Sequence, residues 1–423
     1  MKLNLSRISS AALVAVVLSL TLLALTPNAH AQYTEAVLYN FGATGDSIFP
    51  MSGMIFDGSG NLFGATELGG INDSGDAYEL SPSSGSGWTE NILYSFFGGT
   101  GVSEPSGNLI FDASGNLYGL SKAGGSNRTG TAFEISPTSS GSWKQTILHN
   151  FGGGTDGKTP EGTPIFDTKG NLYATAVVGG LGFGTVVELS PSASGHWTEK
   201  IIYNFTGGSD GSEPGSNLVF DAAGNLYGTA FGGDGTTTCT TGCGTVFRLT
   251  PMGPTWRFTR VFAFGGHDGT YPSALTIDGA GDLYGVAREG GFTKCSGGCG
   301  NVFKLTGPGT NGLWKETVLY NFTGESDGAT PAGVVLDSAG NIFGAASVGG
   351  IDDEGTVFEI SPASGGGWTF SVLYSFQGQT DGGIPAAGVI LDSAGNMYGT
   401  TTYGGSLKGG VAFELSPESG GLK

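Results

Sequence analysis

A nine-residue phrase recurs seven times along this chain and constrains its fold more than any other feature. It reads FDASGNLYG at residues 111–119, and its other copies begin at residues 56, 166, 220, 277, 336 and 391. The Asn or Asp at its sixth position falls at residues 61, 116, 171, 225, 282, 341 and 396, so the copies lie about 55 residues apart. Repetition at a period of this length predicts a repeat architecture in which neighbouring units bury a continuous core.

Each repeat contains four short segments with the composition of β-strands. They are an apolar run after a proline (residues 105–111), the GNLYG of the phrase, a GTVFEL-like segment (residues 185–189) and a segment like WTENILYSF (residues 88–96). They are rich in Val, Ile, Phe, Tyr and Thr and are bounded by Gly, Pro, Ser or Asp, which is typical of strands. No stretch beyond the N-terminus has a helical apolar period, so essentially no helix is expected. Four strands per repeat are typical of propeller blades, and a linear β-solenoid is the alternative.

The two ends of the chain favour the propeller. The C-terminal repeat stops after its third segment, at residues 411–415, and lacks a Trp-containing fourth segment. At the other end, residues 33–41 resemble a fourth segment whose own repeat is missing, with Tyr33 in place of the Trp. A closed ring joins these leftover pieces and removes the exposed sheet edges, whereas a solenoid does not need them to match. We therefore predict an all-β, seven-bladed β-propeller of four-stranded blades at residues 32–423, in which residues 33–41 complete the last blade.

The first 31 residues have the pattern of a secretory signal peptide. Lys2 and Arg7 precede an apolar run at residues 11–25, and Ala29-His30-Ala31 is a small-x-small cleavage sequence. A permanent transmembrane anchor is the alternative, but it needs about 20 apolar residues, and this run is shorter. We expect cleavage after Ala31 and a soluble protein that is secreted or periplasmic, without membrane insertion.

Composition and charge narrow the class of partner. Hydrophobic residues make up 38% of the chain and aromatic residues 11%, enough for a buried core despite 81 glycines in 423 residues. The formal net charge is −19, and it becomes −21 when Lys2 and Arg7 are removed with the signal peptide. A chain this acidic, without a basic patch, does not attract nucleic acid, so we expect no nucleic-acid partner. We expect a monomer.

The repeat unit resembles a known family. Its constant parts are a Pro before the first segment, G-N-L-Y-G, paired glycines, G-T-V-F-E-L-S-P and W-T-E-x-x-L-Y-x-F. In this combination they resemble the GloVer tandem repeat of bacterial exported proteins, and the match covers almost the whole mature chain. The resemblance implies an exported, propeller-like protein without an assigned biochemical role. Relatives of this choice-of-anchor type often carry a C-terminal sorting or anchoring segment, whereas only eight polar or small residues follow Leu415 here.

Two series of recurring aspartates have the spacing of turns. One lies in the phrase, three residues before a Gly, and comprises Asp57, Asp112, Asp167, Asp221, Asp278, Asp337 and Asp392. The other lies between repeats, beside Gly, and comprises Asp46, Asp156, Asp210, Asp268, Asp327 and Asp381. Asp side chains accept backbone N–H bonds in such turns, whereas calcium takes about six to eight oxygens, and no D-x-D-x-D-G run is present. We predict turns, with no metal and no cofactor; weak Ca²⁺ binding is the alternative.

Four cysteines form two closely spaced pairs. Cys239 and Cys243 lie in CTTGC, and Cys295 and Cys299 lie in CSGGC, at the same place in neighbouring repeats. Export implies an oxidising compartment, which favours disulfides for an even number of cysteines. A C-x3-C spacing with glycine inside can close on itself, so we predict the disulfides Cys239–Cys243 and Cys295–Cys299. A zinc site built from all four thiolates is the alternative, although C-x2-C pairs would suit it better.

The loops between the second and third segments differ most among the repeats. Between the constant GG and the constant GTVF they read INDS, SNRT, LGF, DGTTTCTTGC, FTKCSGGC, IDDE and SLKG. In a four-stranded meander, they emerge on the same face as the loops that link the blades. Divergent side chains on a repeated frame are typical of a binding surface, and neutral drift is the alternative. The candidate binding residues on this face, around the channel, are Asn72, Asp73, Arg128, Lys294, Asp352, Asp353, Glu354 and Lys408.

Sequence signatures of catalysis are weak, and no catalytic residue is assigned. His149, His196 and His267 lie in different repeats, and the G-x-S-x-G match at residues 207–211 lies in a linking turn rather than before a helix. We expect a non-catalytic protein that binds a glycan or protein partner through its loop-rich face. The alternative is a polysaccharide hydrolase or lyase with carboxylates at the central channel. Two or more carboxylates with a basic residue at one channel mouth would favour the enzyme.

Overall fold

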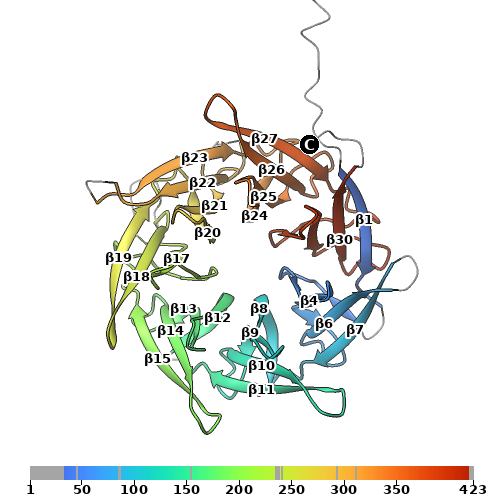
Figure 1. The fold of residues 1–423 in the computed structure, drawn as a ribbon, viewed down its shortest axis with the longest axis vertical. Coiled ribbons are helices and arrows are strands. Elements are labelled where there is room, and N and C mark those ends of the chain that lie inside the picture. Colours follow the sequence, from blue (N-terminus) through green and yellow to red (C-terminus); the bar gives the residue numbers. More distant parts are fainter. Residues whose placement is uncertain are drawn as a thin grey trace, which may run out of the picture.

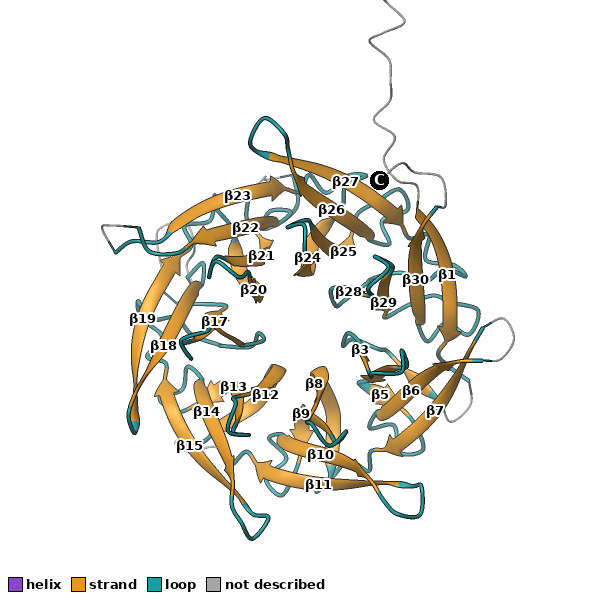
Figure 2. Ribbon diagram, viewed as in Figure 1, coloured by secondary structure: helices purple, strands orange, loops and turns teal. Residues whose placement is uncertain are grey.

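The computed structural model describes residues 33–43, 46–83, 87–152, 155–233, 239, 242–291, 294–309 and 312–418. These residues form strands and turns without a helix, and seven four-stranded antiparallel sheets surround a central axis (Figure 1). Loops join the strands all round the ring (Figure 2). The predicted all-β, seven-bladed propeller is confirmed. The predicted signal peptide and its cleavage site after Ala31 lie outside the described residues, which contain no helix long and apolar enough to cross a membrane.

Each blade runs from an inner strand beside the central axis to an outer strand at the rim (Figure 1). Blade 1 contains β3 (Ile55–Phe56), β4 (Leu62–Ala65), β6 (Asp76–Pro82) and β7 (Trp88–Ser95). Blade 2 contains β8 (Val102–Phe111), β9 (Leu117–Gly124), β10 (Thr131–Pro137) and β11 (Trp143–Asn150). Blade 3 contains β12 (Gly157–Phe166), β13 (Leu172–Gly179), β14 (Thr185–Pro191) and β15 (Trp197–Asn204).

The remaining blades repeat this order. Blade 4 contains β16 (Val219–Phe220), β17 (Leu226–Ala230), β18 (Thr245–Met252) and β19 (Thr255–Ala263). Blade 5 contains β20 (Thr270–Ile277), β21 (Leu283–Glu289), β22 (Asn301–Thr306) and β23 (Lys315–Asn321). Blade 6 contains β24 (Ala329–Leu336), β25 (Ile342–Val348), β26 (Thr356–Pro362) and β27 (Trp368–Ser375). Blade 7 contains β28 (Ile390–Leu391), β29 (Met397–Thr401), β30 (Val411–Pro417) and β1 (Tyr33–Asn40), and β2 (Ser47–Ile48) pairs with β5 (Leu68–Gly69) in a small separate sheet.

The two ends of the chain close the ring in blade 7. Strand β1 pairs antiparallel with β30, from Tyr33 opposite Pro417 to Asn40 opposite Val411. The register shifts between Val37 and Tyr39, at the place where every other pairing of a third with a fourth strand also shifts. The N-terminal strand therefore has the geometry of the fourth strands elsewhere, and it covers the edge of β30 that would otherwise be exposed.

The hydrophobic core lies at the seams, where neighbouring blades pack together. The Phe that follows each outer strand is almost fully buried; these residues are Phe41, Phe96, Phe151, Phe205, Phe264, Phe322 and Phe376. At most seams this ring packs against an aromatic ring on the third strand of the next blade, as Phe96 does with Phe133 at a centroid distance of 5.2 Å. The outer-strand Trp residues also pack across seams, as Trp197 does on Tyr118. Aromatic burial of this kind holds the blades together.

Candidate functional site

The loop after the second strand of each blade and the segment that links it to the next blade lie on one face of the ring. We call this the loop face. At blade 2, the backbone N–H of Thr159, just after the link, donates to the carbonyl of Thr129 in the loop (2.8 Å). The side chain of Asn127 in the same loop donates to the carbonyl of Phe151 in the link (3.3 Å). Both kinds of loop therefore form one continuous surface, as a meander requires.

Each blade carries one left-handed residue on the loop face, just before its inner-strand segment, and we call these residues the left-handed ring. The residue before the proline of each inner-strand segment has a φ between 52° and 58°; these residues are Phe49, Glu104, Thr159, Glu213, Tyr271, Thr330 and Ile384. This backbone conformation is costly for residues other than glycine. It is held by backbone hydrogen bonds to the loop of the preceding blade, such as Ile384 N–H to the carbonyl of Glu354 (2.8 Å). Phe49, Tyr271 and Ile384 have large apolar side chains that are 38–39% exposed.

The central channel contains a cavity of about 510 Å³ that is lined by residues of all seven blades. Its wall extends from residues at the loop face, such as Met51 and Pro105, to Ile110 and Ile165 near the hairpins of the opposite face. Most of the wall is small or apolar. Four charged side chains line it, namely Glu67, Lys122, Glu161 and Arg288. A cavity of this size falls within the range of small-molecule sites.

The charges of the cavity interact with one another. Lys122 Nζ lies 3.4 Å from Glu67 Oε1, and both side chains are partly buried. Burial raises the pKa of Glu161; Lys122 and Arg288 act in the opposite direction, and the negative charges of Glu67 and Glu213 act with burial. The cavity thus combines two carboxyl groups with two cations, and it offers both hydrogen-bond acceptors and donors to a polar ligand. This is the carboxylate and basic-residue combination that favours the enzymatic alternative.

The predicted binding residues lie on the loop face, on loops of five different blades, and the structure does not gather them into one cluster. Four of them are left-handed at equivalent loop positions: Asp73, Arg128, Asp353 and Lys408. Asp73 and Asp353 accept hydrogen bonds from the N–H of Gly69 and Gly349 at 3.1 and 2.8 Å, so their carboxylates stabilise their own loops.

Three of the other predicted binding residues make local contacts. Asn72 donates to the carbonyl of Phe96 (3.2 Å), and Glu354 offers its carbonyl to Ile384. Lys294 forms an exposed ion pair with Glu325 at 2.6 Å, an interaction worth little in water. Asp352 is exposed. Their role in binding a partner stays a prediction.

The repeat pattern does not single out the channel residues, although a signal for them exists. Glu67, Lys122 and Arg288 each lie two residues before the paired glycines that end the second-strand segment. The residue at this position differs among the repeats, and so do the residues on either side of it. The one signal is therefore the shared position at the end of the second-strand segment, and it does not separate these residues from others that vary.

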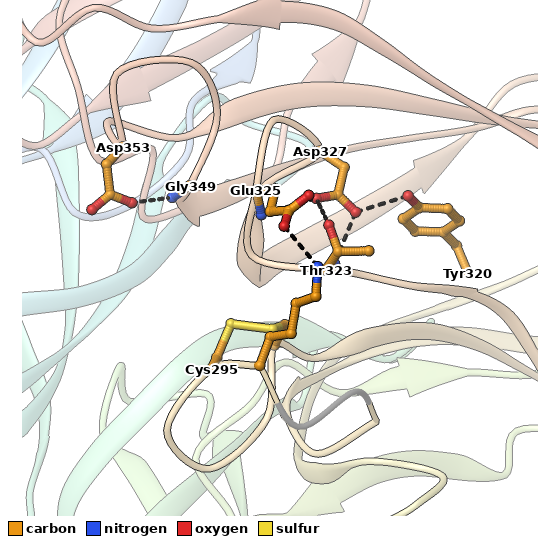
Figure 3. Close-up of a disulfide and its surroundings, with 9 residues drawn as sticks. Cys295, Tyr320, Thr323, Glu325, Asp327, Gly349 and Asp353 are labelled. Atoms are coloured by element: carbon orange, nitrogen blue, oxygen red, sulfur yellow. Dashed lines mark hydrogen bonds and ion pairs between the residues drawn. A yellow bond between two sulfur atoms is a disulfide. The ribbon is translucent and has the colours of Figure 1, made fainter.

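The cysteines form the disulfides Cys239–Cys243 and Cys295–Cys299, with Cα–Cα distances of 5.4 and 5.1 Å. Figure 3 shows Cys295 close to the link between blades 5 and 6, which contains Asp327. The carbonyl of the second cysteine in each disulfide accepts a backbone hydrogen bond from one of the left-handed residues. The N–H of Tyr271 donates to Cys243, and the N–H of Thr330 donates to Cys299. The disulfides therefore brace the two loops to which Tyr271 and Thr330 are bonded.

Both series of aspartates form turns. In the phrase, Asp112 Oδ1 accepts the N–H of Ser114 and of Asn116, at 2.8 and 2.9 Å. In the links, Asp327 Oδ2 accepts the N–H of Thr323 and the hydroxyl of Tyr320, both at 2.8 Å (Figure 3). Equivalent bonds recur in the other copies, so the turn prediction is confirmed for both series.

The link aspartate also takes part in a three-residue contact at the seam. On one side of this aspartate is the residue two positions before the buried Phe, at the end of one blade's outer strand. On the other side is the third residue of the next blade's outer strand, counted from its Trp. At the seam of blades 7 and 1 these residues are Tyr39, Asp46 and Glu90, with the Tyr39 hydroxyl 3.1 Å from Asp46 Oδ2 and 2.9 Å from Glu90 Oε2. Burial, followed by the Asp46 carboxylate, raises the pKa of Glu90 to about 9.

At the seam of blades 2 and 3 the corresponding residues are His149, Asp156 and Glu199. Within the described part of the chain, they are the one group of three metal-ligating side chains whose ligand atoms converge, all within 4.8 Å of one another. Burial, followed by Asp156, raises the pKa of Glu199 to about 7. The sequence does not reveal this cluster because its members come from two blades and the link between them.

The model of the Gloeobacter/Verrucomicrobia repeat family matches residues 21–241 and 236–423, which is nearly the whole chain. The curated proteins contain no sequence that matches it.

Solved structures with a similar fold have low sequence identity to this chain. The extracellular domains of two proteins described as hybrid two component systems from B. thetaiotaomicron match at TM-scores of 0.52 and 0.56 and identities of 12% and 13%. They cover 92% and 91% of this chain, which spans 42% of each of them. A fungal alcohol oxidase in complex with copper matches at a TM-score of 0.53 and 15% identity, over 92% of this chain and 77% of its own. At these identities the similarity shows the fold alone.

Proposed function

Because this chain belongs to the Gloeobacter/Verrucomicrobia repeat family, with one propeller blade for each repeat, we propose that it is an exported binding protein. Its ligand is a glycan, which enters the central channel from the loop face. A fold does not define a function, so the proposal depends on the channel site rather than on the propeller.

The observation that supports a ligand in the channel is the charged cavity of about 510 Å³. Its charges also meet the criterion for the enzyme, and binding is put first because the sequence has no catalytic motif. Glu67 and Glu161 offer acceptors to sugar hydroxyls, and Lys122 and Arg288 offer donors. On the loop face, the exposed ring of Tyr271 presents an apolar surface on which the C–H face of a sugar can pack. The alternative to a glycan is a protein partner that inserts a side chain into the channel.

Three features support export. The N-terminal residues have the pattern of a signal peptide that is cleaved after Ala31. Disulfides such as Cys295–Cys299 persist in oxidising compartments. The similar propellers from B. thetaiotaomicron are extracellular domains.

A glycan-array screen of the protein without residues 1–31, combined with a hydrolysis assay on plant and bacterial polysaccharides, tests the proposal. Binding of a defined glycan without turnover supports it. An array without any bound glycan contradicts the glycan assignment, and release of reducing ends contradicts the absence of catalysis.

A polysaccharide hydrolase or lyase is the second candidate, because two carboxyl groups and two cations line the same cavity. Burial raises the pKa of Glu161, as required of a general acid, and the second carboxyl group, Glu67, lies in an ion pair with Lys122. In this case, Glu161→Gln abolishes turnover but retains glycan binding. Loss of binding with no turnover in either form supports the binding protein instead.

A further inference from the structure

The seven seams provide an internal comparison for the cluster of His149, Asp156 and Glu199. Five seams have Tyr at the position of His149: Tyr39, Tyr94, Tyr203, Tyr320 and Tyr374. The seam of blades 4 and 5 has Phe262 there. The position of Glu199 is taken by Phe258 and Phe370 at two seams, where each stacks on the Tyr. An imidazole therefore meets two carboxyl groups at the seam of blades 2 and 3.

The geometry of this cluster suits a metal ion better than a set of side-chain hydrogen bonds. His149 Nε2 lies 3.4 Å from Asp156 Oδ2, which is long for a hydrogen bond. Asp156 is fixed by two backbone donors, from Gly152 N to Oδ2 (2.7 Å) and from Gly157 N to Oδ1 (2.6 Å). The His149 and Asp156 side chains are only 19% and 21% exposed. Glu199 Oε1 is buried and accepts no hydrogen bond, and the same holds for the equivalent Glu35, Glu90 and Glu316, so the histidine is what distinguishes this seam.

The corresponding Tyr seam shows what the histidine changes. At the seam of blades 7 and 1, the hydroxyl of Tyr39 lies within hydrogen-bonding distance of both Asp46 and Glu90 and donates its one hydrogen to one of these carboxyl groups. A neutral imidazole instead offers a nitrogen lone pair, which is the commonest protein ligand of zinc and similar metals. The backbone bonds that hold the link aspartates in their turns also fix the orientation of the Asp156 carboxylate, as outer contacts do for a ligating carboxylate.

We propose that His149, Asp156 and Glu199 bind a divalent first-row transition-metal cation, with Zn²⁺ as the ion to test. The imidazole nitrogen and one oxygen from each carboxylate are three ligands, and water completes the coordination shell. The ion joins the outer strand of blade 2, the link and the outer strand of blade 3. It binds the folded seam and not the separated strands, so it raises the thermal stability of the propeller.

The test is a calorimetric titration of Zn²⁺ into EDTA-treated protein at pH 7.5, with thermal unfolding measured in parallel. We expect one ion for each chain and a rise in Tm of about 2–4 °C at saturating Zn²⁺. His149→Tyr should abolish both, and it should fold because five other seams carry Tyr at this position. Glu199→Phe, which reproduces the seams with Phe258 and Phe370, should also abolish both.

Two further variants separate this site from adventitious binding. His196→Tyr removes an exposed histidine in a hairpin of blade 3 and should leave the titration unchanged. Tyr39→His places the same three side-chain types at the seam of blades 7 and 1 and should add a second ion. The proposal is wrong if wild type does not bind Zn²⁺ or if His149→Tyr binds it with unchanged stoichiometry.

Discussion

Gly119 of β9 lies directly opposite Phe133 of β10, and the Phe133 ring occupies the space where a side chain at residue 119 would be. A Cβ at Gly119 would lie 2.6 Å from Phe133 Cζ. The same pair recurs in blades 4 to 7, whereas blade 3 has Ala174 opposite Val187. The last position of the recurring phrase is therefore glycine because the Phe ring of the third strand fills the space that a side chain there would need.

Gly119→Ala should destabilise the protein by about 2–3 kcal/mol, because the added methyl group overpacks blade 2. Adding Phe133→Val, which reproduces the pair of blade 3, should recover part of this loss. Urea unfolding of the two single variants and the double variant measures the coupling. Additive losses would show that the two residues do not compete for one space.

Deletion of residues 33–41 should expose the edge of β30 and lower Tm by about 10 °C or more, with association at raised concentration. The reason is that β1 supplies the fourth strand of blade 7 and its following Phe41. Thermal unfolding and light scattering measure the two effects. A monomeric, equally stable truncated protein would contradict ring closure by β1.

The free energy of unfolding should fall as pH rises from about 5 to 9, because of Glu90 at the seam of blades 7 and 1. Glu90 has a folded pKa of about 9 against an ordinary value of 4.5, so the folded state holds a proton that the unfolded state has lost in this range. The groups that face it are Asp46, Tyr39 and Asp76.

Glu90→Gln keeps a neutral hydrogen-bonding group and should gain about 2 kcal/mol over wild type at pH 8, but little at pH 5. Water near this partly open seam keeps the gain below the full cost of the shifted pKa. Denaturant unfolding at the two pH values measures the difference. An equal effect of the substitution at both pH values would mean that Glu90 does not titrate in this range.

The repeat pattern is sufficient to predict the blade number, ring closure and aspartate turns, because these depend on local spacing and on matching the chain ends. The channel site depends on which residues of seven blades meet at one axis. Lys122 and Arg288 lie in different repeats and interact with Glu161 only after the ring has closed. The cluster at His149 likewise requires the close contact of two outer strands across a seam. Sequence spacing does not contain this information.

The most direct test of the channel proposal compares the affinity of the best glycan from the array for wild type, Arg288→Ala and Lys408→Ala. Arg288 lines the cavity, whereas Lys408 is an exposed residue of the blade 7 loop. Titration calorimetry should show about a 10- to 100-fold loss of affinity for Arg288→Ala, the cost of one charged hydrogen bond, and a smaller loss for Lys408→Ala, a predicted residue of the loop surface. Unchanged affinity of Arg288→Ala with a loss for Lys408→Ala would contradict the account and place the site on the outer loops.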